Sequence, residues 1–219
     1  MAENERGIKK VVGLIGVALV VILAALFHVG FASAVEKEER SLDSGIKVVP
    51  SAETVWNTIM DRSVDSSLGT PFRRYAMHTM PVYGKEFHST LIEYPYGSSK
   101  HTDSLAAKPA HGIILYVHGY NDYFFQKELA EKADSAGYAF FAIDLHYCGR
   151  SLMPDDARGD MRNMREFFAE LDYAVELARV ITKERADSLP MVLMGHSQGG
   201  LLAAFYADHR PEEKFAALV

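Results

Sequence analysis

The stretch Met191-Val192-Leu193-Met194-Gly195-His196-Ser197-Gln198-Gly199-Gly200 decides the fold of this chain. It begins with a short apolar run typical of a buried strand, and residues 201–206 continue it with a sequence typical of a buried helix. A turn between such a strand and helix is so tight that side chains at Gly195 and Gly199 would collide with the neighbouring backbone. The pattern Gly-His-Ser-Gln-Gly therefore predicts a strand, a turn and a helix, with the hydroxyl of Ser197 exposed above the strand end.

A second turn follows residues 112–117, which form another continuous apolar run. It reads His118-Gly119-Tyr120, and the glycine allows the backbone to bend so that the N–H of Tyr120 faces Ser197. The N–H of Gln198 is expected to face the same space from a helix N-terminus, where negative charge is favoured. We therefore expect these two N–H groups to form an oxyanion hole, which stabilises the charge that develops when a hydroxyl attacks a carbonyl group.

Two histidines flank these turns. We interpret His118 as a brace of its loop, and His196 as a residue fixed beside the nucleophile that cannot reach round to the hydroxyl. The alternatives are an ordinary strand-end turn at His118 and a passive serine in a glycine-rich turn at Ser197.

The rest of the chain alternates strand and helix patterns. Residues 112–117, 138–145 and 191–194 predict strands buried on both faces, and the amphipathic runs between them predict helices. Residues 75–82 and 87–94 flank Tyr83-Gly84-Lys85 and have the pattern of a hairpin. We expect an α/β fold with a mostly parallel sheet and helices on both faces. Its domain should span residues 72–219, with a further strand starting at residue 215.

A third motif brings a family resemblance into view. The α/β-hydrolase superfamily shows an apolar strand ending in His-Gly, then Asp-x-Arg-Gly-x-Gly-x-Ser, then Gly-x-Ser-x-Gly, in that order. This chain resembles it, in particular the serine hydrolases grouped with monoacylglycerol lipases, lysophospholipases and serine aminopeptidases. The chain keeps three residues of the middle motif: Asp144, Gly149 and Ser151. It departs where the family usually has Arg, Gly and His: His146, Tyr147 and Cys148.

The resemblance implies a serine hydrolase of carboxylic esters with Ser197 as the nucleophile. It implies lipid-like acyl esters such as a lysophospholipid or a monoacylglycerol, although a peptidase or a thioesterase would use the same groups. Asp144 is then structural and ties down its turn. Cys148 is not expected to be a nucleophile, because nothing in the sequence marks a thiol with a lowered pKa.

The catalytic acid and base are missing from the expected places. In this fold both follow the serine along the chain. His209 is the only histidine after Ser197, and Asp208 is the only carboxylate between them. The expected helix places both about 16 Å from the hydroxyl, so we reject them. We expect the acid, the base and a lid beyond Val219, in a fold truncated after the helix that follows the serine. The alternative is a non-catalytic, membrane-tethered protein of the same fold.

Composition limits the partners. Lys and Arg number 23 against 29 Asp and Glu, for a formal net charge of −6, which argues against nucleic acid as a partner. Cys148 is the only cysteine, so no internal disulfide can form. No cofactor and no metal site are predicted.

The N-terminus predicts a membrane-associated location. Residues 11–35 form an apolar run that meets the roughly 20 residues needed to cross a bilayer, and Arg6, Lys9 and Lys10 precede it. We expect a transmembrane signal anchor with the domain outside the cytoplasm. Ala32-Ser33-Ala34 has the form of a signal-peptidase site, so secretion after cleavage near Ala34 is the alternative. Residues 36–71 are interpreted as a tether with some helix.

Overall fold

The structure is a computed structural model that describes residues 51–79, 87–99, 109–183 and 189–219. The apolar run over residues 11–35 and the hairpin turn at residues 83–85 lie outside the described residues. Among the helices that are described, none is long and apolar enough to cross a membrane.

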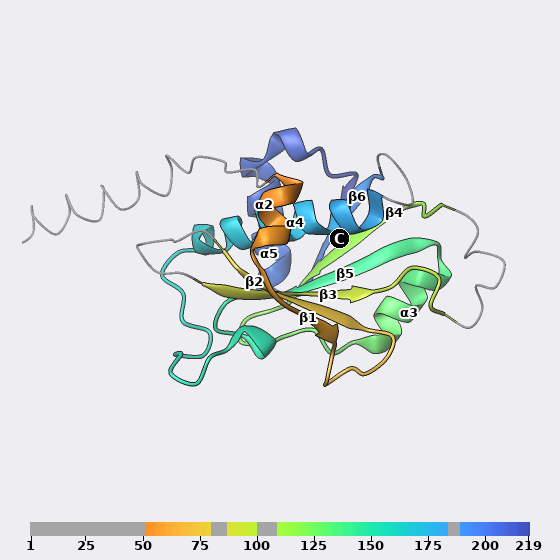
Figure 1. The fold of residues 1–219 in the computed structure, drawn as a ribbon. Coiled ribbons are helices and arrows are strands. Elements are labelled where there is room, and N and C mark those ends of the chain that lie inside the picture. The colour runs from red at the N-terminus through yellow and green to blue at the C-terminus, as the bar shows by residue number, and fades with distance from the viewer. Residues whose placement is uncertain (1–50, 80–86, 100–108, 184–188) are drawn as a thin grey trace, which may run out of the picture. The chain divides into compact units, whose positions relative to one another are not determined.

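The strands of the described residues form one sheet in the order β1-β2-β3-β5-β4-β6-β7 (Figure 1). Their bounds are β1 (Ile59–Val64), β2 (Arg73–His78), β3 (His88–Tyr94), β4 (Gly112–Val117), β5 (Tyr138–Asp144), β6 (Met191–Gly195) and β7 (Ala217–Leu218). The three strands expected to be buried, the hairpin pairing of β2 with β3 and the strand near the C-terminus are therefore confirmed.

The sheet is mixed, so the prediction of a mostly parallel sheet was wrong. The parallel pairs join β5 to β4, β4 to β6 and β6 to β7, as expected. The pairs that join β1 to β2, β2 to β3 and β3 to β5 are antiparallel. Antiparallel neighbours can follow one another after a short turn, whereas parallel neighbours need a crossover. The strands that precede β4 therefore form an antiparallel half of the sheet.

The packed domain begins earlier than Phe72. Helix α2 (Ala52–Asn57) starts at Ser51, whose hydroxyl accepts a hydrogen bond from the N–H of Thr54 at 3.1 Å. Strand β1 follows it, inside the stretch interpreted as a tether over residues 36–71. β1 lies at the edge of the sheet, and its side chains alternate between exposed and partly buried. A polar edge strand of this kind has little of the apolar signal that identified β4, β5 and β6.

Helices cover both faces of the sheet (Figure 1). Helix α3 (Lys127–Ser135) lies on one face, over a buried cluster that includes Phe124 and Phe140. Helices α2, α4 (Phe168–Lys183) and α5 (Gln198–His209) lie on the other, over a larger cluster that includes Leu193. In the parallel half, Val117 at the end of β4 lies level with Ile143 and Gly195. The loops that follow β4, β5 and β6 therefore meet at one edge, where α/β proteins bind their ligands.

Candidate active site

Ser197 stands in the tight turn that the sequence predicts. β6 ends at Gly195 and α5 begins at Gln198, and Ser197 between them has φ 54° and ψ −118°, a conformation rare for residues other than glycine. A Cβ atom at Gly195 would lie 2.4 Å from the backbone N of Gly200. One at Gly199 would lie 2.3 Å from the backbone of the β4 strand end. The two glycines thus allow the helix to start directly against the end of β4.

The loop after β4 lies beside the serine. A Cβ atom at Gly119 would lie 3.4 Å from the Cβ of Ser197, so the two turns are in contact. His118 is buried, and its Nε2 accepts a hydrogen bond from the N–H of Leu145 at 3.0 Å. The other ring nitrogen, Nδ1, must then carry the hydrogen, which it donates to the carbonyl of Gly119 at 2.7 Å. Both ring nitrogens are occupied, so His118 links two strand ends and is not a base.

His196 lies at the surface of its turn. Its side chain is 65% exposed, and its Nδ1 lies 4.0 Å from a carboxylate oxygen of Asp122. A Cβ atom at Gly119 would lie 3.2 Å from the same nitrogen, so the ring covers the contact between the two turns. The arrangement is that of a neighbour of the serine rather than a partner of its hydroxyl.

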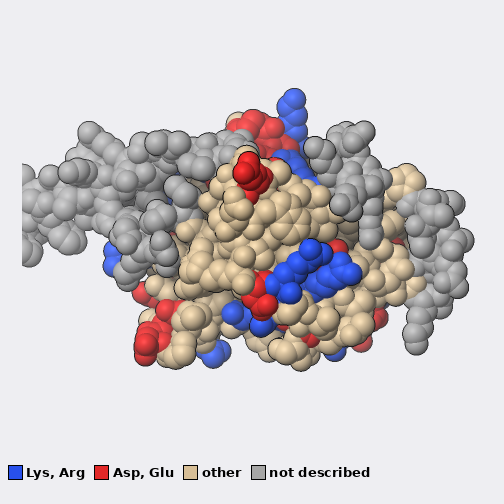
Figure 2. Space-filling model, viewed as in Figure 1, with Lys and Arg blue, Asp and Glu red and all other residues tan. Residues whose placement is uncertain are grey.

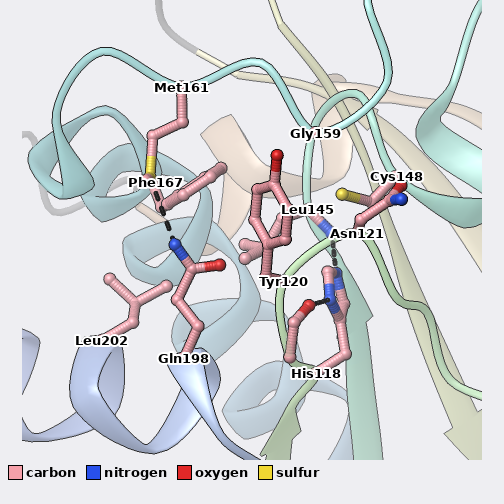
Figure 3. Close-up of a pocket in the computed structure, with 11 residues that line it drawn as sticks. His118, Tyr120, Asn121, Leu145, Cys148, Gly159, Met161, Phe167, Gln198 and Leu202 are labelled. Atoms are coloured by element: carbon pink, nitrogen blue, oxygen red, sulfur yellow. Dashed lines mark hydrogen bonds between the residues drawn. The ribbon is translucent and has the colours of Figure 1, made fainter.

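A pocket lies between the loop after β4 and the start of α5, where Gln198, the residue after Ser197, is part of its wall (Figure 3). It encloses about 320 Å³, counting the part open to solvent, and the side-chain amide of Gln198 donates across it to the sulfur of Met161 at 3.7 Å. Its lining residues are His118, Gly119, Tyr120, Asn121, Leu145, Cys148, Gly159, Met161, Phe167, Gln198 and Leu202. Four of them belong to the predicted site: His118, Gly119, Tyr120 and Gln198. Sequence reasoning missed the apolar wall, because its members come from loops and helices without a motif.

Three of the four residues other than glycine that have a positive φ in the described part of the chain lie in the loops of the site; the fourth is Lys214. Asn121 after β4, Tyr147 after β5 and Ser197 after β6 have φ values of 50°, 58° and 54°. Left-handed conformations of residues with a Cβ atom cost about 1–3 kcal/mol each and cluster at functional sites. The loops of this edge are therefore held by contacts strong enough to maintain that strain.

One such contact is an ion network around Arg150. Asp144 accepts hydrogen bonds from the backbone N–H of Phe124 and Arg150, at 2.9 and 3.1 Å, as expected for a residue that ties down its turn. Arg150 also binds Asp144 through Nη1 at 2.7 Å and Asp65 through Nε at 2.6 Å. Burial alone would raise the pKa of Asp65, but the hydrogen bonds from Arg150 and from backbone N–H groups hold it below its usual value. The network fastens the loop after β5 to the segment after β1.

A second contact is a buried cluster around His146. Its backbone N–H donates to Glu170 at 2.8 Å, and its Nδ1 pairs with the other oxygen of the same carboxylate. The ring stacks on Phe87 with centroids 4.0 Å apart and packs against Phe167. Its Nε2 lies 3.9 Å from a carboxylate oxygen of Glu166. Although this histidine and carboxylate resemble an acid–base pair, the ring is 1% exposed and faces Glu166, so it is not placed to serve Ser197.

The cluster makes stability depend on pH. Burial alone would lower the pKa of His146, but the carboxylates of Glu170, Glu166 and Asp156 outweigh burial and raise it. The stabilisation from a raised histidine pKa is fully present below the unfolded value of about 6.5, and it is lost as pH rises through the folded value. We therefore expect the native protein to have a higher free energy of unfolding than His146→Gln at low pH. This difference should decrease above about pH 6.5, by at most about 1.4 kcal/mol per pH unit. Denaturant titrations from acid to alkaline pH measure it.

The control for this experiment is His196→Gln, because His196 is exposed and outside the cluster. Its difference from the native protein, measured over the same range, gives the effect of removing a histidine outside the cluster. A difference for His146→Gln that stays constant with pH, or one that grows, would contradict a protonated His146.

The other candidates lie where the sequence suggested. Burial, followed by the carboxylates of Glu170 and Asp144, raises the pKa of Cys148 to about 11, so this thiol stays protonated and unreactive near neutral pH. His209 is in the last turn of α5, where its Nδ1 bonds the carbonyl of Phe205 at 2.9 Å. Among the residues that the structure describes, no group of three or more His, Cys, Asp or Glu side chains could hold a metal ion.

The family follows from comparison with known sequences. The family described as serine aminopeptidase, S33 (Hydrolase_4) matches residues 108–219, just over half of the chain. The chain belongs to this family. The α/β-hydrolase resemblance seen in the three motifs is thereby confirmed.

The chain is similar to proteins named as lipid and ester hydrolases. The chain is 30% identical over 108 residues to a phospholipase, YtpA, of Bacillus subtilis (strain 168), covering 49% of this chain and 38% of that protein. It is 21% identical to a carboxyl esterase from Bacillus coagulans, with a TM-score of 0.47 and coverage of 64% and 41%. A monoglyceride lipase variant from Saccharomyces cerevisiae gives 21% identity, a TM-score of 0.46 and coverage of 63% and 40%. The chain thus spans about two fifths of the length of these proteins.

Proposed function

We propose that this chain carries the nucleophile of a serine hydrolase that cleaves carboxylic esters, with lipid-like acyl esters such as a lysophospholipid or a monoacylglycerol as substrates. The observation that carries the proposal is the strained backbone of Ser197, held by two glycines where β6 meets α5. Strain of this kind keeps a hydroxyl exposed at a functional site. Membership of the S33 family and the phospholipase relative support a hydrolytic reaction.

The surroundings of Ser197 suit such a reaction. In our proposal the serine hydroxyl attacks the ester carbonyl, and the N–H groups of Tyr120 and Gln198 stabilise the oxyanion that forms. Gln198 begins a helix of 12 residues, whose N-terminus favours that negative charge. The pocket is lined by apolar side chains such as Phe167 and Leu202, which suit an acyl chain better than a charged group.

Catalysis also needs a base for the serine proton. Each histidine described around the site is engaged or turned elsewhere. His118 bonds both strand ends, His146 pairs with Glu170, and His196 is exposed beside Asp122. We propose that the acid and the base come from residues that follow Val219. Because the described residues offer no base, a non-catalytic protein of the same fold remains the second candidate.

The experiment compares residues 1–219 with a protein extended through the strands that would follow. Without a base, Ser197 is a poor nucleophile, so residues 1–219 should turn over a chromogenic acyl ester only at trace level. The extended protein should be active, and Ser197→Ala should remove that activity. If residues 1–219 turn over the ester as fast as the extended protein does, the base does not follow Val219 and this part of the proposal is refuted. An inactive, folded extended protein would favour the non-catalytic candidate.

A further inference from the structure

His118 holds two backbone groups at once, one in its own loop and one just after β5 (Figure 3). The N–H of Leu145, just after β5, donates to its Nε2, and its Nδ1 donates to the carbonyl of Gly119. Only one form of the ring satisfies both bonds, namely the neutral ring with its hydrogen on Nδ1. Since the ring is 2% exposed, water cannot readily replace either partner.

The hydrogen bond to the carbonyl of Gly119 also determines where the next N–H along the chain, that of Tyr120, points. The carbonyl of Gly119 and the N–H of Tyr120 belong to the same peptide group, which is planar and trans, so they point in opposite directions. When Nδ1 of His118 holds the carbonyl on its own side, the N–H of Tyr120 is turned to the opposite side. A rotation of this single peptide group would replace the N–H by a carbonyl oxygen, which repels an oxyanion.

We propose that His118 is the positioning residue of the oxyanion hole: its Nδ1–H fixes the Gly119–Tyr120 peptide so that the N–H of Tyr120 stays directed at the reacting oxygen. This inference rests on the proposed function, because it requires Tyr120 N–H to be a donor in catalysis. In this role His118 forms no bond to Ser197 or to the reacting atoms, and acts through the peptide group alone.

The opposite bond of His118 supplies a rigid frame. Leu145 precedes His146, whose backbone N–H and ring are both held by Glu170 of α4. The Leu145 N–H therefore projects from a strand end that is fastened to a buried helix, and Leu145 itself lines the pocket. Any rotation of the His118 ring would therefore break the hydrogen bond that its Nε2 accepts from the N–H of Leu145.

Two substitutions separate the two bonds of His118. In His118→Asn the side-chain amide nitrogen can occupy the place of Nδ1 and keep the donor to Gly119. In His118→Gln the longer side chain can place an acceptor near Nε2 for Leu145, but leaves the Gly119 carbonyl free. In the extended, active protein we expect His118→Gln to lower kcat by about 10²- to 10³-fold with little change in KM, the effect of losing one oxyanion donor. His118→Asn should stay within about tenfold of the native kcat.

A second measurement uses a reversible transition-state analogue, a trifluoromethyl ketone. Its affinity should fall in parallel with kcat/KM in His118→Gln, whereas the affinity for a non-reactive substrate analogue should not. Equal kcat values for the two variants, or losses that track only thermal stability, would overturn the positioning role.

If neither variant folds, nitrogen NMR of His118 in the native protein decides, because a hydrogen on Nε2 would overturn the proposal. Failure of the proposed function is distinct, since activity would then survive Ser197→Ala.

Discussion

Ser197→Ala should abolish labelling by a fluorophosphonate probe and lower kcat of the extended protein by about four to six orders of magnitude. The alanine lacks the oxygen that we propose forms the bond to the acyl carbon, so only the proposed oxyanion donors and substrate binding would remain to accelerate the reaction. The free energy of unfolding should change little, because the serine side chain makes no hydrogen bond that caps α5. Gel-based labelling and ester turnover measure the two effects.

The matched control is Cys148→Ala, which removes the other nucleophilic atom near the pocket. Its thiol is buried and its pKa is raised to about 11, so the variant should label like the native protein. Equal labelling of Ser197→Ala and the native protein would exclude Ser197 as the nucleophile. Labelling lost in Cys148→Ala but kept in Ser197→Ala would assign the reaction to the thiol.

Arg150→Ala should lower the free energy of unfolding by about 3–5 kcal/mol, the effect of removing one partner of a buried ion pair. Asp65 and Asp144 are 1% and 0% exposed, so their carboxylates would remain in the core without the guanidinium that now lies between them. Part of this loss is the unpaired charge itself. Adding Asp65→Asn to Arg150→Ala should therefore recover some of the stability, as measured by denaturant unfolding.

Arg158→Ala is the control for charge and size, because Arg158 is an exposed arginine in the same region of the chain. It should change the free energy of unfolding by less than about 0.5 kcal/mol. A loss below about 1 kcal/mol in Arg150→Ala would mean that water solvates the two carboxylates and that the network does not fasten the loop.

The turns at Gly119 and Gly195 could be predicted because their signal is local. A glycine after an apolar run marks a place where backbone must pass close to backbone, and at Gly195 the structure leaves no room for a Cβ atom. The buried strands β4, β5 and β6 could be predicted for a similar reason, since each is a continuous apolar run between turns. Residues of one short segment carry the whole pattern in each case.

The ion network and the histidine cluster could not be predicted, because their partners are distant in the chain. Asp65 and Arg150 are separated by 85 positions, and His146 and Glu170 by 24. Nothing near any of these residues indicates its partner, and Asp65 lies in a stretch whose polar strand was interpreted as a tether. Charged side chains that are distant in the chain also meet at the surface. On the face shown in Figure 2, a group of basic side chains lies directly beside acidic ones, among mostly uncharged residues.

The place of β5 in the sheet affects how this protein is made. β3 and β4 follow one another along the chain, yet β5 lies between them in the sheet, so the two cannot be joined through β5 until residue 144 has been synthesised. At about 5–20 residues per second, a ribosome needs roughly several seconds to extend the chain from β3 to the end of β5. During that interval β3, whose side chains are almost all buried in the finished sheet, has an open edge. A nascent chain in this state would be a natural client of chaperones that shield strand edges.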